Sequence, residues 1–197
     1  DHVCVAACWR PCGLERISAV FQGVKPGYTY GRQVNPTVGA LEKKITAMEG
    51  GLGSVCFGTG MAAIGTTMFA LLRAGDHVVS SAFLFGNTTS LFNSFGRQGL
   101  DVSFVDATDV ANVANAITAQ TKMVFVETIA NPRTQIADLE AIGELCQQRG
   151  LIYVVDNTMT SPFLFQPREV GASLAINSLT KYISGHGNVL GLSLIHI

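Results

Sequence analysis

Short runs of β-branched and apolar residues recur between residues 54 and 178, and most of them are followed by a polar or glycine-rich turn and a stretch with helical spacing. Continuous apolar strands that alternate with helices are typical of a parallel sheet buried on both faces. We expect strands at residues 54–57, 77–81, 102–105, 123–127, 151–155 and 174–178. The pattern therefore predicts an α/β fold with a mostly parallel sheet that is covered by helices on both faces.

Two of the expected helices have clear start and stop signals. In the first, Asn35 can cap the helix, Pro36 occupies the first turn, and the glycine pair at 50–51 ends it. In the second, Asp138 is the expected cap and Gly150 the stop. The apolar residues that share one face are Leu41, Ile45 and Met48 in the first helix, and Leu139, Ile142, Leu145 and Cys146 in the second.

Composition narrows the possible partners of the chain. Its 197 residues are 48% hydrophobic, which is enough to form the core of one domain or of one lobe of something larger. The net charge is −1 and no run of like charges occurs, so we expect neither nucleic acid nor a membrane surface as a partner. The apolar runs are too short to span a bilayer, and no secretory signal is recognisable, which favours a cytoplasmic location.

The cysteines do not indicate disulfides or a metal site. Cys56 and Cys146 lie inside apolar patterns, where a buried, reduced thiol is the expected state. Cys4, Cys8 and Cys12 recur at every fourth residue, but no C-x-x-C pair or companion histidine completes a zinc motif. We therefore expect no bound metal.

The residues that follow the strands are the candidates for chemistry, because ligands of open α/β sheets bind beyond the carboxyl ends of the strands. The first strand is followed by "GTGMAAIG", whose glycines leave backbone N–H groups at a helix N-terminus, where they favour a phosphate. The side chains collected after the other strands are Phe83 and Phe85, Asn131, Asp156 and Lys181.

Together these groups are the parts needed to hold pyridoxal 5'-phosphate. Lys181 would form a Schiff base with the cofactor aldehyde, and Asp156 would keep the pyridine nitrogen protonated. Phe85 would fix the plane of the ring, and the hydroxyls of Ser178 and Thr180 suit phosphate oxygens.

Each of these residues also has a commoner structural explanation. Taken alone, Lys181 would be a solvated side chain, Asp156 would cap a turn, and Phe85 would belong to the core. His186, between two glycines, is expected to be a turn or packing residue, and Glu127 can be structural. The cofactor hypothesis depends on the ordered occurrence of the whole set.

A dinucleotide site is the main rival for the glycine-rich loop, because "GTGMAAIG" follows a strand and opens a helix. The second strand, however, ends in "SS" and not in the acidic residue that binds a ribose, and the glycine spacing differs from G-x-G-x-x-G. The sequence therefore disfavours a nicotinamide cofactor.

The motifs resemble those of a known family over residues 19–191. They are "YTYGRQVNPTVGALE", "GTGMAAI", "ETIANP", "VVDNTMTSP" and "NSLTKYISGHGN". In this order they resemble the Cys/Met-metabolism family of pyridoxal-phosphate enzymes, which includes cystathionine γ-synthase, cystathionine lyases, methionine γ-lyase and homoserine-ester sulfhydrylases. The resemblance implies the large domain of a fold-type I transferase. It also implies that the family's small C-terminal domain lies beyond Ile197, and it does not extend to residues 1–18 and 192–197.

The resemblance implies a role for each matching position. Lys181 would be the catalytic lysine, and Tyr30 and Arg32 would reach the phosphate site of a neighbouring subunit, so the active unit would be a dimer or tetramer. The implied cofactor-binding residues within one subunit are Gly60, Met61, Phe85, Asn131, Asp156, Ser178, Thr180 and Lys181.

The implied reaction is a γ-replacement or a γ-elimination on a homoserine ester, cystathionine or methionine. Phe85 stands where lyases of this family often have tyrosine, so a phenol hydroxyl that could transfer a proton is absent. This difference weighs against a standard methionine γ-lyase, which remains an alternative. A second alternative is a catalytically silent fragment that only binds the cofactor or associates with relatives.

Overall fold

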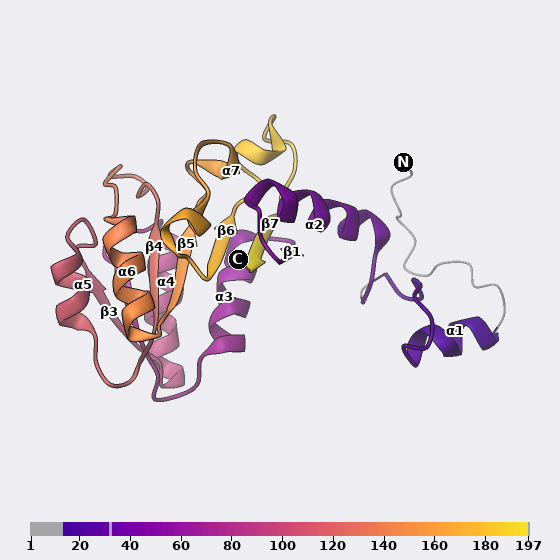
Figure 1. Ribbon diagram of the computed structural model, residues 1–197, viewed down its shortest axis with the longest axis horizontal. Helices are drawn as coiled ribbons and strands as arrows, with labels where there is room; N and C mark the ends of the chain where they lie inside the picture. The colour runs from indigo at the N-terminus through magenta and orange to yellow at the C-terminus, as the bar shows by residue number, and fades with distance from the viewer. Residues whose placement is uncertain (1–13, 32, 197) are drawn as a thin grey trace. The chain divides into compact units, whose positions relative to one another are not determined.

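The computed structural model describes residues 14–31 and 33–196, which divide between Lys44 and Ile45 into two compact units (Figure 1). The first unit contains α1 (Leu14–Phe21) and the start of α2 (Pro36–Glu49). Oδ1 of Asn35 accepts hydrogen bonds from the backbone N–H groups of Thr37 at 2.9 Å and Val38 at 3.3 Å. The predicted cap and both predicted ends of this helix are confirmed.

The second unit is built on a seven-stranded sheet with the order β1-β7-β6-β5-β4-β2-β3 (Figure 1). The strands from β6 to β3 pair in parallel, as the alternating pattern predicted. The bounds are β1 Gly53–Phe57, β2 His77–Ser81, β3 Asp101–Val105, β4 Thr121–Glu127, β5 Ile152–Asp156, β6 Leu174–Asn177 and β7 Leu192–His196.

Strand β7 was not predicted, because the sequence analysis treats residues 192–197 as an atypical tail. It lies between β1 and β6 and runs antiparallel to both, with Leu194 opposite Val55 on one side and Ile176 on the other. Ile195 on this strand is fully buried. This strand joins the sheet between β6, which shortly precedes it in the chain, and β1, which lies about 140 residues earlier.

Helices cover both faces of the sheet, as expected (Figure 1). Residues of α3 and α4 share one buried cluster with the sheet, and residues of α5 and α6 share the cluster on the opposite face. The bounds of the remaining helical elements are α3 Gly60–Leu71, α4 Gly86–Phe95, α5 Val110–Ala116, α6 Leu139–Arg149, α7 Ser161–Leu164, η1 Gly96–Gln98, η2 Pro167–Val170 and η3 Tyr182–Ser184.

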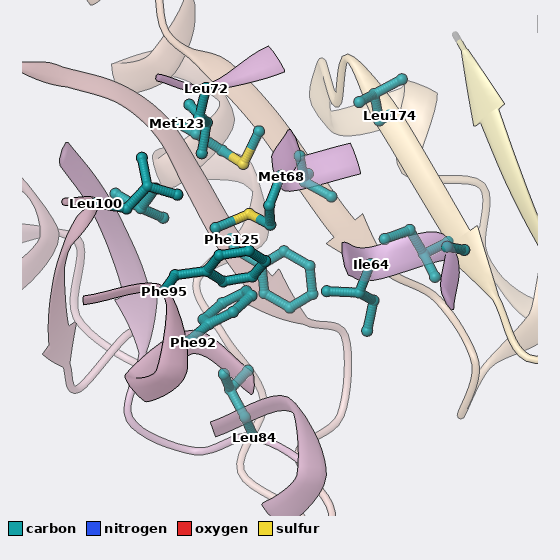
Figure 2. Packing of buried hydrophobic residues seen from close by; sticks show 14 residues of the cluster. Ile64, Met68, Leu72, Leu84, Phe92, Phe95, Leu100, Met123, Phe125 and Leu174 are labelled. Atoms are coloured by element: carbon teal, nitrogen blue, oxygen red, sulfur yellow. The ribbon is translucent and has the colours of Figure 1, made fainter. Parts of the chain in front are cut away.

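Aromatic side chains form the centre of the core beneath α3 and α4 (Figure 2). The rings of Phe92 and Phe125 meet edge to face with centroids 5.0 Å apart, and Met68 packs in the same cluster. On the other face, Val124 and Val155 pack with Ile142 of α6. Burial on both faces explains why the strands read as continuous apolar runs.

Helix α6 differs in one detail from the prediction. Asp138 is its N-cap residue, but in the described structure its side chain makes no capping hydrogen bond, and only its carbonyl accepts from Ile142 N at 3.0 Å. Gly150 ends the helix in the left-handed conformation with φ of 64°, as expected. Ile142 and Cys146 are buried as predicted, and burial raises the pKa of the Cys146 thiol to about 12.

Two further expectations concern metals and membranes. Among the described residues, no group of three His, Cys, Asp or Glu side chains is placed to hold a metal ion. The evenly spaced Cys4, Cys8 and Cys12 lie outside those residues. Over residues 14–31 and 33–196, no helix combines the length and the hydropathy that a bilayer span requires.

Candidate active site

The predicted site residues meet at one cavity of about 620 Å³ at the carboxyl ends of the strands. This volume lies within the range of roughly 300 to 1,000 Å³ that is usual for small-molecule sites. The cavity is lined by all the predicted cofactor-binding residues of the second unit, which are Gly60, Met61, Phe85, Asn131, Asp156, Ser178, Thr180 and Lys181. The parallel sheet brings them together because its strands end at a common edge.

The N-terminus of α3 forms one wall of the cavity. Thr59 caps the helix, since its Oγ1 accepts from Ala62 N at 3.1 Å. The N–H groups of Gly60 and Met61 belong to the first turn, where backbone donors have no acceptor within the helix. Together with the positive end of the helix dipole, they are suited to bind an anion such as phosphate.

Asp156 ends β5 and is half-buried in the cavity wall. Within the described structure, both hydrogen bonds of its carboxylate end on Oδ1, from Thr158 N at 3.0 Å and Thr158 Oγ1 at 2.6 Å. Burial nevertheless raises the pKa of this carboxyl above its ordinary value. The residue therefore caps a turn, as the commoner explanation predicts, and a cationic ligand at Oδ2 would stabilise its charged form.

Thr158 links two strand ends and was not singled out by the sequence analysis. Its Oγ1 donates to Asp156 and accepts from the backbone N–H of Ser178 at 2.9 Å. A single hydroxyl thus connects the carboxylate after β5 with the segment after β6. Its position two residues after Asp156 in "VVDNTMTSP" is the signal that could have identified it.

Lys181 lies in the turn between β6 and η3. The turn is anchored by Leu179, which is 6% exposed and packs with Ile45, Ala175 and Ile195. The backbone N–H of Lys181 donates to the carbonyl of Ser178 at 3.1 Å. Its exposed side chain lines the cavity, so it occupies the same site as Asp156.

Thr180 lines the cavity and also makes hydrogen bonds within the protein, so its contact with a phosphate stays a prediction. Its hydroxyl donates to the carbonyl of Gly191 and accepts from the backbone N–H of the same residue, both at 3.1 Å. This pair of bonds joins the lysine turn to the segment that leads into β7. Ser178 also lines the cavity, and its contact with a phosphate likewise stays a prediction.

Phe85 and Asn131 line the cavity from two different loops. Phe85 is 44% exposed, so the alternative that it is a core residue is wrong. Glu127 at the end of β4 contacts both loops, because its Oε1 accepts from Phe85 N at 2.6 Å and its Oε2 from Asn131 N at 3.2 Å. Burial, together with the neighbouring Asp156, raises the pKa of Glu127 to about 7.

Three positions that the sequence analysis discussed are Tyr30, Arg32 and His186. Tyr30 belongs to the first unit, and Arg32 lies outside the described residues, so their reach into a neighbouring subunit stays a prediction. His186 is exposed and does not line the cavity, although the adjacent glycines do. The remaining cavity-lining residues, which the sequence analysis did not select, are Thr59, Ile64, Thr88, Glu127, Ile129, Thr158, Met159, Tyr182, Gly185 and Gly187.

Comparison with known proteins identifies the class to which this fold and site belong. The family model described as "Cys/Met metabolism PLP-dependent enzyme" matches residues 13–195. The chain therefore belongs to the Cys/Met-metabolism family of pyridoxal-phosphate-dependent enzymes, as its motifs suggested. Its fold is that of the large domain of a fold-type I enzyme.

Individual relatives carry several different names. The chain is 42% identical to an L-methionine gamma-lyase of Fusobacterium nucleatum subsp. polymorphum over 166 residues, which are 83% of this chain and 42% of that protein. It is 41% identical to a cystathionine beta-lyase of Coxiella burnetii over 171 residues, 86% of this chain and 44% of that protein. The chain thus spans less than half the length of these relatives.

A solved structure shares the fold and contains the cofactor group. It is described as an O-acetylhomoserine (thiol)-lyase of Campylobacter jejuni with N'-pyridoxyl-lysine-5'-monophosphate. The similarity has a TM-score of 0.91 at 30% identity and covers all of this chain and 49% of that one.

Proposed function

We propose that this chain is the cofactor-binding part of an enzyme that catalyses γ-replacement or γ-elimination on a sulfur-containing or O-activated amino acid. The observation that carries the proposal is the convergence of Lys181, Asp156 and the N-terminus of α3 on one cavity of suitable size. A lysine, a carboxylate and an anion site can bind the aldehyde, the ring nitrogen and the phosphate of pyridoxal phosphate, respectively.

The cavity fits the cofactor at both ends. The N–H groups of Gly60 and Met61, with the hydroxyl of Ser178, would hold the phosphate. Asp156 would pair with the ring nitrogen through the oxygen that Thr158 leaves unused, and this pairing would offset the cost of its burial. Phe85 would lie against the ring plane, and Asn131 would contact its rim.

Lys181 has two tasks in this proposal. It would hold the cofactor covalently, and its freed amine would carry protons between Cα and Cβ of the substrate. Bound pyridoxal phosphate would supply the electron-accepting ring. Tyr182 lines the cavity and is exposed, and in this proposal the substrate would enter beside it.

The substrate class follows from the relatives and is less sharply defined than the cofactor. We infer an amino acid with a leaving group at Cγ, such as a homoserine ester, cystathionine or methionine. Related chains are named as methionine gamma-lyase, cystathionine gamma-lyase and O-succinylhomoserine sulfhydrylase. We further propose a homo-oligomer in which Tyr30 and Arg32 complete the phosphate site of a partner.

Reductive trapping tests the cofactor site directly. The purified chain is mixed with pyridoxal phosphate, reduced with borohydride and digested, and the modified peptide is identified by mass. We expect a pyridoxyl adduct on Lys181 that is lost in Lys181→Ala. The matched control is Lys122→Ala, which removes an exposed lysine of β4 outside the cavity. An adduct that persists in Lys181→Ala would contradict the proposal.

A second candidate is a chain that binds the cofactor without turnover. The observation in its favour is that the chain spans 42 to 45% of the length of the methionine gamma-lyases that it matches. Turnover of O-acetylhomoserine, cystathionine or methionine at a rate proportional to cofactor occupancy would exclude it. Release of methanethiol from methionine in the same assay would favour a methionine γ-lyase over the other members, although Phe85 lacks the phenol hydroxyl.

A further inference from the structure

Glu127 is a buried acid whose two oxygens contact two different loops of the cavity. It ends β4, and only 7% of its surface is exposed. Oε1 accepts from the backbone N–H of Phe85 at 2.6 Å, and Oε2 accepts from that of Asn131 at 3.2 Å. Hydrogen bonds to an ionised acceptor are about twice as strong as neutral ones, so this arrangement ties both loops to the strand end.

The contact with Phe85 also caps a helix. Phe85 is the N-cap residue of α4, and its own side chain makes no capping hydrogen bond. Glu127, 42 residues away in the sequence, supplies the negative charge that favours a helix N-terminus. This hydrogen bond joins the start of α4, and the residue that carries the Phe85 ring, to the end of β4.

Several titratable or charged side chains lie near Glu127 or near the loops that it contacts. Asp156 lies directly opposite it in the β4–β5 register, so two carboxyl groups end neighbouring strands. Lys181 and Tyr182 line the same cavity, and Arg133 in the loop after β4 lies 5.9 Å from the Phe83 ring centroid. In the described residues, the hydrogen bonds of the Glu127 carboxylate come from the two loop amides alone.

We propose that Glu127 is a positioning residue that fixes the spacing between the Phe85 loop and the Asn131 loop and thereby sets the width of the ring-binding part of the cavity. The inference rests on the proposed cofactor site. In this inference Glu127 positions Phe85 and Asn131, which would contact the cofactor. Glu127 itself transfers no proton.

The substitution Glu127→Gln separates this role from simple filling of space. Glutamine has the same shape, but one of its two terminal groups is an N–H donor that would face a backbone N–H donor. One of the two loops would therefore lose its contact and move. Glu140→Gln is the matched control, because Glu140 is exposed on α6 and lies outside the cavity.

The first measurement uses the cofactor-free protein and backbone amide NMR. Protonation of Glu127 weakens both of its hydrogen bonds, so the amide signals of Phe85 and Asn131 should shift together with pH, with one midpoint near 7. The shared titration should vanish in Glu127→Gln and persist in Glu140→Gln. Independent midpoints for the two amides, or a shared titration that survives Glu127→Gln, would overturn the inference.

The second measurement is the affinity for pyridoxal phosphate, followed by the visible absorption of the bound cofactor. We expect Glu127→Gln to weaken binding about tenfold, with the reduced adduct still on Lys181, and Glu140→Gln to bind as the parent protein does. Parent-like binding by Glu127→Gln would refute the inference while leaving the proposed function intact.

Together, the experiments distinguish an error in the proposed cofactor site from an error in the proposed role of Glu127. If the parent protein forms no adduct on Lys181, the proposed cofactor site is wrong, and the NMR titration still decides whether Glu127 ties the loops. If Glu127→Gln does not fold, Glu127→Asp replaces it. Aspartate keeps both acceptors on a side chain shorter by one methylene, so it should reach one loop only and weaken cofactor binding to an intermediate extent. Full affinity in that variant would count against the role.

Discussion

Gly143 in α6 offers a sharp test of the packing that supports the site. A Cβ atom at this position would lie 1.8 Å from the carbonyl oxygen of Val170 and 3.5 Å from Tyr153 Cε1. The Val170 carbonyl belongs to η2, the turn that precedes β6. The absence of a side chain at Gly143 is therefore what allows α6 to approach the segment that leads to Lys181.

Two opposing contributions determine the effect of Gly143→Ala. Alanine is a better helix former than glycine, which stabilises the variant by about 1 kcal/mol. Against this, the helix and the η2 carbonyl must separate by more than 1 Å to reach an ordinary contact, and overpacking of this kind costs typically 1 to 3 kcal/mol, occasionally more. Because the obstructing atom belongs to the backbone, we expect the upper part of that range and a net destabilisation of about 2 kcal/mol.

Urea unfolding of the cofactor-free protein measures this difference. With an m-value of roughly 2 kcal/mol/M, the midpoint should fall by about 1 M in Gly143→Ala. The matched control is Gly65→Ala in α3, which is also buried, but where the new Cβ would meet its nearest neighbour, Leu91 Cδ2, at an ordinary 3.9 Å. In that variant the helix preference should dominate and the midpoint should rise slightly. A Gly143→Ala protein as stable as the parent would refute the packing argument.

Two further predictions concern buried polar contacts. Glu49 is fully buried, and its Oε1 accepts from Asn157 Nδ2 at 3.3 Å and Asn177 Nδ2 at 2.5 Å, while burial raises its pKa above the ordinary 4.5. A raised folded-state pKa contributes stability that is fully present below this ordinary pKa and is lost as pH rises through the folded-state pKa. Urea unfolding should therefore show Glu49→Gln becoming more stable relative to the parent as pH rises above 4.5. A stability difference that does not change with pH would contradict the prediction. Thr158→Val removes the hydroxyl that donates to Asp156. We expect this variant to bind pyridoxal phosphate about tenfold more weakly in an absorbance titration. An affinity equal to that of the parent would show that this hydrogen bond does not position the carboxylate.

Much of the fold could be predicted from local patterns. The strands from β1 to β6 and the helix at Pro36 follow from apolar runs, capping residues and glycine stops, all of which act over a few residues. Strand β7 could not be predicted in the same way. Its identity as a strand depends on pairing with β1, about 140 residues earlier in the numbering, and with β6, and no local signal encodes that pairing.

Some residues of the site could also be proposed from the sequence, and others could not. Lys181, Asp156 and the glycine-rich turn could be proposed from sequence because each directly follows an apolar strand, and strand ends of a parallel sheet meet at one edge. The hydrogen bonds of the Thr180 and Glu127 side chains could not be proposed from the sequence. The hydroxyl of Thr180 is engaged by Gly191, and Glu127 caps a helix that begins 41 residues before it.

The sequence by itself determined the fold class, the family and the residue types available at the strand ends, because short-range periodicity and ordered motifs are properties of the chain alone. The tertiary structure decided which hydroxyls are already engaged, which acid ties the loops together and where the last strand inserts. These features depend on contacts between residues far apart in the chain, and their geometry is fixed only when the two faces of the sheet are packed.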